Sequence, residues 1–178
     1  RRRDVCLEAH PEIDMCAHAA MAVDAETKEK LYDICPSSED TILTVEQVIL
    51  LDGGGISTNS LFYRKSLIDN LPDFRKICTL DYTMQIQGAI RSGIYFLSRN
   101  MSAYRYMSKN SWSSIRNKNI DKKVQSNKTV CLALNSFDEY TDFKYTDTVQ
   151  DMIRRYEFSS LKLLKNYKEM RNPKYRDL

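Results

Sequence analysis

The pattern of apolar and polar residues predicts one long strand near the start of the chain. From 12 to 24, apolar side chains recur at every second position on one face, and the other face is also mostly apolar or small. A period of two is typical of a strand, and two apolar faces indicate a strand inside a sheet that is covered on both sides. The first face carries Ile13, Met15, Ala17, Ala19, Met21 and Val23, and the second carries Cys16, His18, Ala20 and Ala22.

The rest of the chain alternates short elements with loops and then becomes helical. The spacing of apolar residues predicts helices over 45–51, 66–71, 80–92, 127–140 and 146–170, and strands over 58–65, 94–97 and 101–106. The end of a further helix precedes Pro11, and the polar stretches 25–40 and 108–121 are expected to be loops. We therefore expect an α/β fold with a partial sheet, flanking helices and a C-terminal helical tail.

The expected division is a domain over 1–125 and a helical tail over 126–178 that packs on it. The tail carries an apolar stripe, and such a stripe needs a partner surface. The strand over 12–24 needs a neighbour on each edge, and few other strands are predicted. This mismatch indicates that the chain is part of a longer protein.

Composition and charge exclude several classes of protein. Hydrophobic residues make up 42% of the 178 residues, which is too many for a wholly disordered chain. The net charge of +3 gives no bulk electrostatic case for nucleic-acid binding, and no apolar run approaches the roughly 20 residues of a membrane span.

The five cysteines show no C-x-x-C spacing, which argues against a zinc site. They lie mostly among apolar neighbours, so we interpret them as reduced packing residues and expect a cytoplasmic protein. They are Cys6, Cys16, Cys35, Cys78 and Cys131. Of the two histidines, His18 lies in the predicted strand and is interpreted as a structural residue.

An ordered series of short motifs fills the segment 52–113. A glycine run is followed by small polar residues, an aromatic-Arg-Lys strand, a Leu-Pro turn and an aspartate that opens a helix. A Gly-x-Tyr sequence, a Tyr-Arg pair and a Ser-Trp pair come next. The motifs are Gly53-Gly54-Gly55, Ser57-Thr58-Asn59-Ser60, Phe62-Tyr63-Arg64-Lys65, Leu71-Pro72, Leu80-Asp81, Gly93-Ile94-Tyr95, Tyr104-Arg105 and Ser111-Trp112.

This series resembles the second half of bacterial family 2 glycosyltransferases, which have a GT-A fold. The resemblance covers about residues 5–115, includes His10-Pro11-Glu12 with the strand that follows, and extends more weakly into the tail. It depends on the order and spacing of the motifs, because no single motif is specific. One departure is that Tyr106 stands where the family often places a histidine.

The resemblance implies transfer of a sugar from a nucleotide sugar to a hydroxyl of a growing surface polysaccharide, with inversion at the anomeric carbon. It implies that Asp81 is the general base that takes the proton of the acceptor hydroxyl. The alternative is that Asp81 is a helix-start acid favoured by the helix dipole. If Asp81 is not the base, Asp52 and Asp73 are the next candidates.

The other motifs supply candidate substrate-binding residues. The amides of Gly53, Gly54 and Gly55 are candidates to approach sugar hydroxyls or phosphate, or else they form a tight surface turn. Ser57, Asn59 and Ser60 are candidates to bond sugar hydroxyls, although a polar strand start explains them nearly as well. Arg105 is a candidate to face the diphosphate, or else forms a structural salt bridge. Trp112 is a candidate to stack on a sugar, or else anchors a loop.

The nucleotide-binding half of such an enzyme is not recognisable in this sequence. No Asp-x-Asp motif occurs, so no residue here is a predicted metal ligand. We expect Mg²⁺ or Mn²⁺ in the full-length enzyme, none bound to this chain, and an isolated chain that is inactive. The donor would then bind to the missing half, and the acceptor would be a saccharide or a lipid-linked saccharide.

Several alternatives stay open at the level of sequence. In one alternative the chain is a non-catalytic carbohydrate-binding or assembly domain. In another its tail is an interaction module, and the α/β body is incidental. The basic tail is either a solvated helix face or a peripheral contact with the inner face of an anionic membrane. A homo-oligomer also stays open. The basic residues are Lys162, Lys165, Lys168, Arg171, Lys174 and Arg176.

Overall fold

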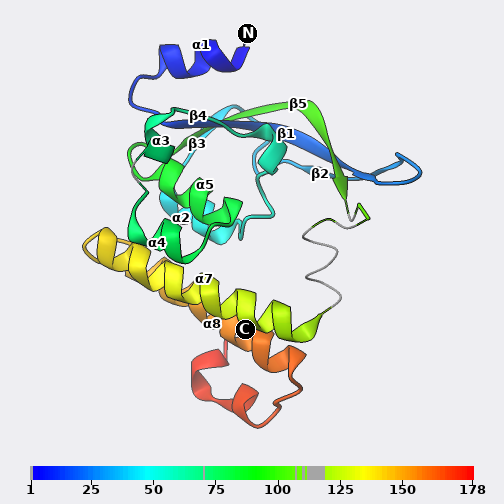
Figure 1. Cartoon of the computed structure of the whole chain (residues 1–178), viewed down its shortest axis with the longest axis vertical. Coiled ribbons are helices and arrows are strands. Elements are labelled where there is room, and N and C mark those ends of the chain that lie inside the picture. Colours follow the sequence, from blue (N-terminus) through cyan, green and yellow to red (C-terminus); the bar gives the residue numbers. More distant parts are fainter. Residues whose placement is uncertain (1, 70, 107, 110, 112–118) are drawn as a thin grey trace. The chain divides into compact units, whose positions relative to one another are not determined.

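The computed structural model describes residues 2–69, 71–106, 108, 109, 111 and 119–178, with side chains from residue 6 onward. The fold is mixed α/β, as the sequence predicts. Its strands are β1 (Met15–Asp24), β2 (Lys30–Ile34), β3 (Thr41–Leu43), β4 (Phe62–Tyr63) and β5 (Ile94–Tyr106). Its helices are α1 (Arg2–Ala9), α2 (Val45–Leu50), α3 (Ser66–Asp69), α4 (Asp73–Ile77), α5 (Asp81–Ala89), α7 (Ile120–Tyr140) and α8 (Thr146–Leu163), together with the short 3₁₀ turns η1 (Thr58–Ser60), η2 (Glu169–Arg171) and η3 (Pro173–Tyr175) (Figure 1).

The chain divides into two compact units. The first, which we call the sheet unit, comprises Arg1–Leu71 and Thr79–Ser108. The second, the helical unit, comprises Pro72–Cys78 and Lys109–Leu178. The division differs from the expected boundary after residue 125, because α7 begins at Ile120 and because the α4 segment from the middle of the chain belongs with the helical tail.

Strand β1 is the centre of the sheet, whose order is β2-β1-β5-β3, with β4 also paired to β1. It pairs in parallel with β5 on one edge and antiparallel with β2 and β4 on the other. The expectation that this chain offers too few sheet neighbours for β1 is therefore wrong. Two strands were missed, because β2 and β3 come from stretches too polar or too short to show a strand pattern.

Residues 94–106 form one strand instead of the two predicted. The β1–β5 pairing shifts register between His18 and Ala20, and the shift absorbs the extra residues of β5 between Leu97 and Ser102. A bulge of this kind interrupts the sequence pattern without ending the strand.

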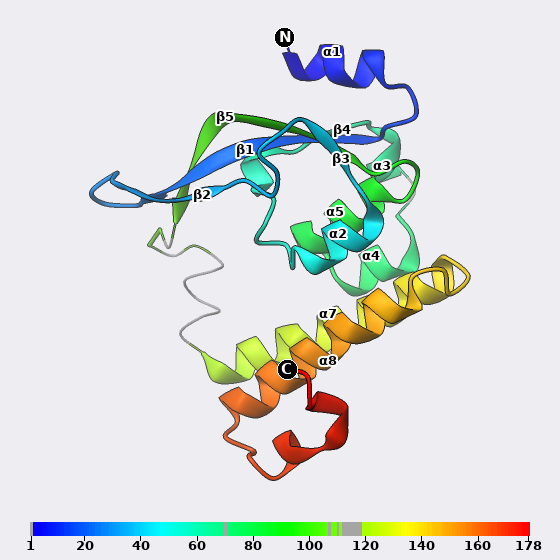
Figure 2. The same cartoon turned by 180° about the vertical axis from the view of Figure 1, so that it is seen from behind.

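Both faces of β1 are covered, as its apolar pattern predicts. Helix α1 lies on one side of the sheet, and α2 and α5 lie on the other (Figure 1 and Figure 2). Met15 packs against α5 so closely that a Cβ on Gly88 would come within 2.8 Å of the Met15 Cβ. On the opposite face, Cys16 clusters with Cys6, Leu7 and Ile13.

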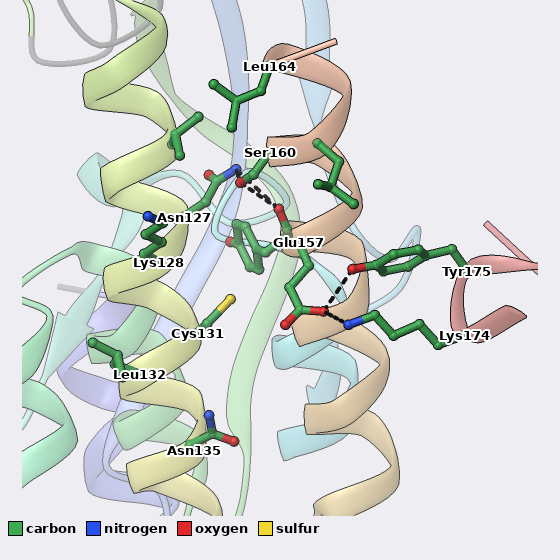
Figure 3. A pocket seen from close by; sticks show the side chains of 13 residues that line it. Asn127, Lys128, Cys131, Leu132, Asn135, Glu157, Ser160, Leu164, Lys174 and Tyr175 are labelled. Atoms are coloured by element: carbon green, nitrogen blue, oxygen red, sulfur yellow. Dashed lines mark hydrogen bonds and ion pairs between the residues drawn. The ribbon is translucent and has the colours of Figure 1, made fainter. Parts of the chain in front are cut away.

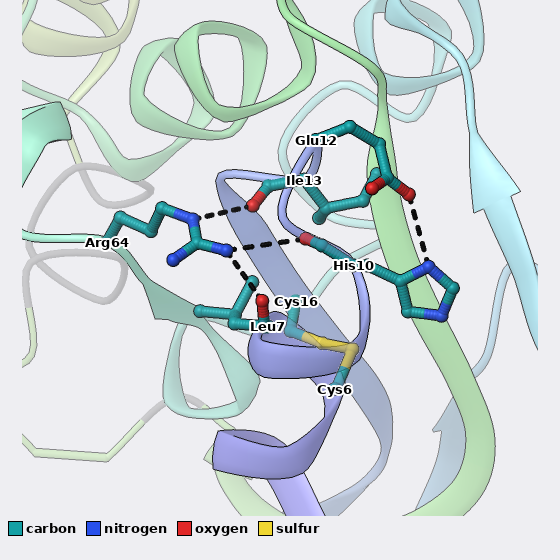
Figure 4. The surroundings of a disulfide bond; sticks show 7 residues. All are labelled: Cys6, Leu7, His10, Glu12, Ile13, Cys16 and Arg64. Atoms are coloured by element: carbon teal, nitrogen blue, oxygen red, sulfur yellow. Dashed lines mark hydrogen bonds and ion pairs between the residues drawn. A yellow bond between two sulfur atoms is a disulfide. The ribbon is translucent and has the colours of Figure 1, made fainter.

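The turn between α1 and β1 is fixed by Arg64 and by a disulfide (Figure 4). The Arg64 guanidinium donates to three backbone carbonyl oxygens, those of Leu7 (2.6 Å), Ile13 (2.9 Å) and His10 (3.3 Å). Cys6 and Cys16 form the disulfide. The prediction that all five cysteines are reduced is wrong for this pair, because the turn folds α1 back onto β1 and brings the two thiols together.

The helical unit is built on α7 and α8, whose apolar faces pack against each other and against α4. Phe137 is fully buried and contacts Phe74 of α4 edge to face (5.4 Å between ring centroids) and Tyr145 in a stacked geometry (5.7 Å). Helix α7 begins earlier than predicted, because Asn119 caps it by accepting a hydrogen bond from the Lys122 amide (2.9 Å). Helix α8 ends at Leu163, seven residues earlier than predicted, and Lys165 then takes a positive φ of 54°.

None of the helices described by the structure is both long and apolar enough to cross a membrane.

Candidate active site

Asp81 is the first residue of α5, and its carboxylate is held by two hydrogen bonds. Oδ1 accepts from the Tyr82 amide (3.1 Å), and Oδ2 accepts from the Thr58 hydroxyl. The residue is half-buried. It is not the N-cap of the helix, since that position belongs to Leu80. The carboxylate therefore has a fixed position, which a general base needs.

Thr58 reaches Asp81 because the chain from Ile56 to Ser60 runs beside the same face of α5. Gln85 lies four residues after Asp81 and so shares its helix face. The Gln85 amide is fully buried and donates to the Ile56 carbonyl (3.2 Å). This bond, together with the Thr58–Asp81 bond, positions the segment along the start of the helix.

The candidate residues Ser57, Asn59 and Ser60 surround Thr58 in and around η1. The Ser57 hydroxyl donates to Asn59 Oδ1 (2.6 Å), and the Ser60 hydroxyl donates to the Ser57 carbonyl (2.7 Å). Both serines are buried, whereas Asn59 is exposed. The serine protons are therefore used within the chain, and Asn59 is the best placed of the three residues to contact a ligand.

Asn59 also joins this segment to β5. Its amide nitrogen donates to the Ala103 carbonyl (3.0 Å), and its amide oxygen accepts from the Ser102 hydroxyl (3.3 Å). The pairing of β3 with β5 ends at Phe96. Further along the same edge of β5, Asn59 forms the hydrogen bonds to Ser102 and Ala103 in place of a strand. Segments more than 40 residues apart in sequence thus meet beside Asp81.

The glycine run forms a turn that packs against α5. Gly53 has a φ of +67°, and a Cβ there would lie 2.9 Å from the Tyr82 Cβ, so only glycine fits. The amides of Gly54 and Gly55 both donate to the Leu51 carbonyl (3.1 Å each). The turn lies against the residue that follows Asp81, but two of its three amides are already hydrogen-bonded.

Arg105 is exposed on β5 and forms no ion pair with any residue that the structure describes. It pairs in register with Val23, and strand alternation puts both residues on the sheet face of Met15, which is the face that carries α5. The alternative interpretation was that Arg105 forms a structural salt bridge, but no acidic partner for it is found among the described residues. Trp112 lies outside the described residues.

The other aspartates are less suited to act as the base. Asp73 belongs to the helical unit, and its carboxylate pairs with Lys76 (2.8 Å) in an exposed position. The Lys76 ammonium donates to this carboxylate and lowers the pKa of Asp73 below its usual value. Asp52 is exposed in the turn that precedes Gly53.

The described residues around Asp81 do not fit the divalent ion that the resemblance implies. The side chains of Ser57, Thr58 and Asn59 bring hydroxyl and amide groups to Asp81, whereas Mg²⁺ and Mn²⁺ sites use carboxylates together with substrate phosphates. In residues 6–69, 71–106, 108, 109, 111 and 119–178, no group of three or more His, Cys, Asp or Glu residues is arranged to hold a metal ion.

Sequence reasoning missed three residues that organise this unit: Thr58, Gln85 and Arg64. Thr58 and Arg64 belong to motifs that were recognised in the sequence. No sequence pattern showed that Thr58 would bond a carboxylate or that Arg64 would bond backbone carbonyls. Gln85 had one available signal, since it is a polar residue four positions after Asp81 on a helix that is otherwise largely apolar.

Comparison with protein-family models, with curated protein sequences and with solved structures found no match for this chain.

Proposed function

We propose that this chain is the acceptor-side half of a nucleotide-sugar glycosyltransferase in which Asp81 is the general base. The observation that carries the proposal is the Asp81 carboxylate, which is fixed at the start of α5 by Thr58 and Tyr82. The motifs that resemble family 2 glycosyltransferases also support it. The glycine turn and the small polar run lie beside this aspartate, although they are distant in sequence.

The proposed reaction is a displacement at the anomeric carbon of the donor sugar. The acceptor hydroxyl oxygen forms a bond to that carbon, the bond from the carbon to the diphosphate oxygen breaks, and the nucleoside diphosphate leaves with the electron pair. The hydroxyl proton passes to the Asp81 carboxylate. Asn59 is exposed, and its amide nitrogen carries a second N–H beyond the one donated to Ala103, which it can donate to a sugar hydroxyl. Arg105, which forms no ion pair with a described residue, offers positive charge to the leaving diphosphate.

The proposal places the donor on a nucleotide-binding half that this chain does not contain. Its acceptor is a saccharide or a lipid-linked saccharide, and its location is the cytoplasm or the inner face of the membrane, where the basic tail contacts anionic lipid. Disulfides are typical of oxidising compartments. The Cys6–Cys16 disulfide therefore counts against the cytoplasmic location. Thiol trapping in intact cells tests the location, since recovery of both residues as thiols would favour the cytoplasm.

A non-catalytic carbohydrate-binding domain is the second candidate. It is favoured by the Gly54 and Gly55 amides, which are engaged within their own turn. The two proposals differ in one outcome, since only the first requires sugar transfer.

The test is a transfer assay on the product of the complete reading frame, with UDP- and GDP-sugars, Mn²⁺ and oligosaccharide acceptors. The proposal predicts release of nucleoside diphosphate that depends on the acceptor. It also predicts that calorimetric titration of the isolated 178-residue chain with the same nucleotide sugars shows no binding heat. Turnover or micromolar donor binding by the isolated chain would contradict the half-enzyme assignment.

A further inference from the structure

The helical unit contains a pocket of about 530 Å³ between α7, α8 and the C-terminal turns (Figure 3). Ligand pockets in proteins typically measure about 300–1,000 Å³, so this volume is large enough for a small molecule. Its walls are mainly apolar and include Val124, Leu132, Leu161 and Leu164. Leu132 is 61% exposed and Leu164 is 54% exposed, so the mouth of the pocket presents uncovered aliphatic surface.

The polar groups within the pocket are largely satisfied by one another. Asn127 donates to the Ser160 hydroxyl (3.0 Å), and Ser160 donates to the Tyr156 carbonyl (2.9 Å). The Glu157 carboxylate accepts from Lys174 (2.9 Å) and from the Tyr175 hydroxyl (3.1 Å). These bonds leave little for a polar ligand to gain in the interior, because a ligand group would have to replace an existing bond.

The Cys131 thiol also lines the pocket and is neutral at physiological pH. Burial, with a smaller contribution from the Glu157 carboxylate, raises the pKa of Cys131 to about 11. Figure 3 shows its sulfur directed into the space between α7 and α8. A neutral thiol behaves as a small hydrophobic group, so it extends the apolar wall.

Lys128 is the exception among the polar lining residues. It is exposed, and its ammonium forms no ion pair within the described part of the chain, whereas Lys174 is paired with Glu157. The C-terminal segment next to the pocket adds positive charge, since residues 160–178 include six basic residues and only the acidic Glu169 and Asp177. The pocket therefore combines an apolar interior with an unneutralised cation at its lining.

We propose that this pocket binds a long-chain anionic amphiphile, with the acyl chain among the leucines and the anionic head at Lys128. A free fatty acid and an anionic phospholipid both have this chemistry. The inference does not depend on the proposed sugar transfer, because all the residues that carry it belong to the helical unit.

The first experiment compares dodecanoate with dodecanol, which has the same chain and no charge, in calorimetric titration of the 178-residue chain below the micelle concentration. Dodecanoate should bind more tightly, by roughly three- to tenfold, because one partly exposed charged contact contributes about that much. Lys128→Gln should remove this difference and leave dodecanol binding unchanged. The matched control is Lys122→Gln, which changes an exposed lysine of α7 that does not line the pocket and should alter neither ligand.

The second experiment uses the pocket thiol as a reporter. Dodecanoate should slow the labelling of Cys131 by a maleimide at pH 8.5, whereas the exposed Cys35 thiol in the same chain should react at an unchanged rate. Cys131→Phe, which puts a large side chain into the pocket, should weaken binding of both ligands. The melting temperature of this variant shows whether it is folded. The labelling experiment is made on the wild-type chain, so its result does not depend on the folding of the variant.

Co-sedimentation with vesicles distinguishes the two sources of the ligand. Phosphatidylglycerol vesicles that bind the wild type but not Lys128→Gln indicate a bilayer lipid, and binding of dodecanoate alone indicates a free acid. Equal affinity for dodecanoate and dodecanol overturns the proposal, as does an equal effect of Lys128→Gln and Lys122→Gln. Unprotected labelling of Cys131 at saturating dodecanoate also overturns it.

Discussion

The sheet unit and the helical unit are each stabilised internally by a different kind of contact. In the sheet unit, polar side chains connect segments far apart in sequence, as Arg64 does with Leu7 and as Asn59 does with Ala103. In the helical unit, apolar stripes of two long helices meet, and Phe137 lies fully buried among aromatic rings. Both candidate sites follow this division, since the first is a network of hydrogen bonds around one carboxylate and the second is an apolar pocket.

The largest expected effect comes from removing the helices that cover α4. Deletion of residues 127–178 removes Phe137 and Tyr140, the aromatic partners of Phe74. Each large buried side chain that loses its cover costs roughly 1.5–3 kcal/mol. We expect a lower melting temperature or aggregation. A melting curve identical to that of the whole chain would show that the tail is an independent appendage.

A point substitution tests the same packing within the intact chain. Phe137→Ala should destabilise the protein by about 3–5 kcal/mol, because it leaves a cavity in a closely packed aromatic cluster. Phe143→Ala is the matched control, since Phe143 is 64% exposed, and its removal should change the unfolding free energy by less than about 0.5 kcal/mol. Urea denaturation measures both values, and similar losses for the two variants would contradict the assigned core.

In the sheet unit, the glycine turn should be sensitive to a single methyl group. Gly53→Ala forces a side chain into a positive φ and against Tyr82, at a cost of roughly 1–3 kcal/mol. Gly54→Ala is the control, because its added methyl group meets open space. Thermal melting of both variants checks the difference. If Gly54→Ala is as unstable as Gly53→Ala, the claim that the turn requires glycine at position 53 but not at position 54 is wrong.

The smallest expected effect is a pH dependence of stability that comes from Asp40 and from Ser98, which lies in the bulge of β5. The amide and hydroxyl of Ser98 donate to the Asp40 carboxylate and lower the pKa of Asp40 below its ordinary value of 3.8. The resulting stabilisation is present above pH 3.8 and is lost as the pH falls through the lowered pKa. Asp40→Asn should therefore be slightly less stable than the wild type at pH 7, and the difference should shrink in acid. A difference that stays constant from pH 7 to pH 2.5 would rule out this ionisation.

The sequence predicted the elements whose patterns are local. The alternation from 12 to 24 and the stripes of the two long helices were strong because burial repeats at a fixed period, and β1, α7 and α8 were identified. Strand β2 was missed because four of its five residues are exposed, and β3 because it has only three residues. The disulfide was missed because the meeting of Cys6 and Cys16 depends on how the turn at Pro11 folds.

The candidate site was predictable only in part, for the same reason. The helix that Asp81 starts was predicted from the apolar spacing over 80–92 and from Gly93, which are local signals. The Thr58–Asp81 and Asn59–Ala103 contacts join segments 23 and 44 residues apart. Pairings across such separations are set by the folded sheet, and no single sequence shows them.

The central claim is that Asp81 is a general base and not merely a residue that starts a helix. The direct measurement is the rate of sugar transfer by the full-length protein, with donor affinity and melting temperature, for the wild type, Asp81→Asn and Asp73→Asn. Asp73 is the matched control because it is also the first residue of a helix. For Asp81→Asn we predict a loss in turnover of at least roughly 10²-fold, with donor affinity and stability nearly unchanged, and for Asp73→Asn a loss of no more than a few fold. Turnover within a few fold of wild type in Asp81→Asn, or loss of its stability together with activity, would contradict the account.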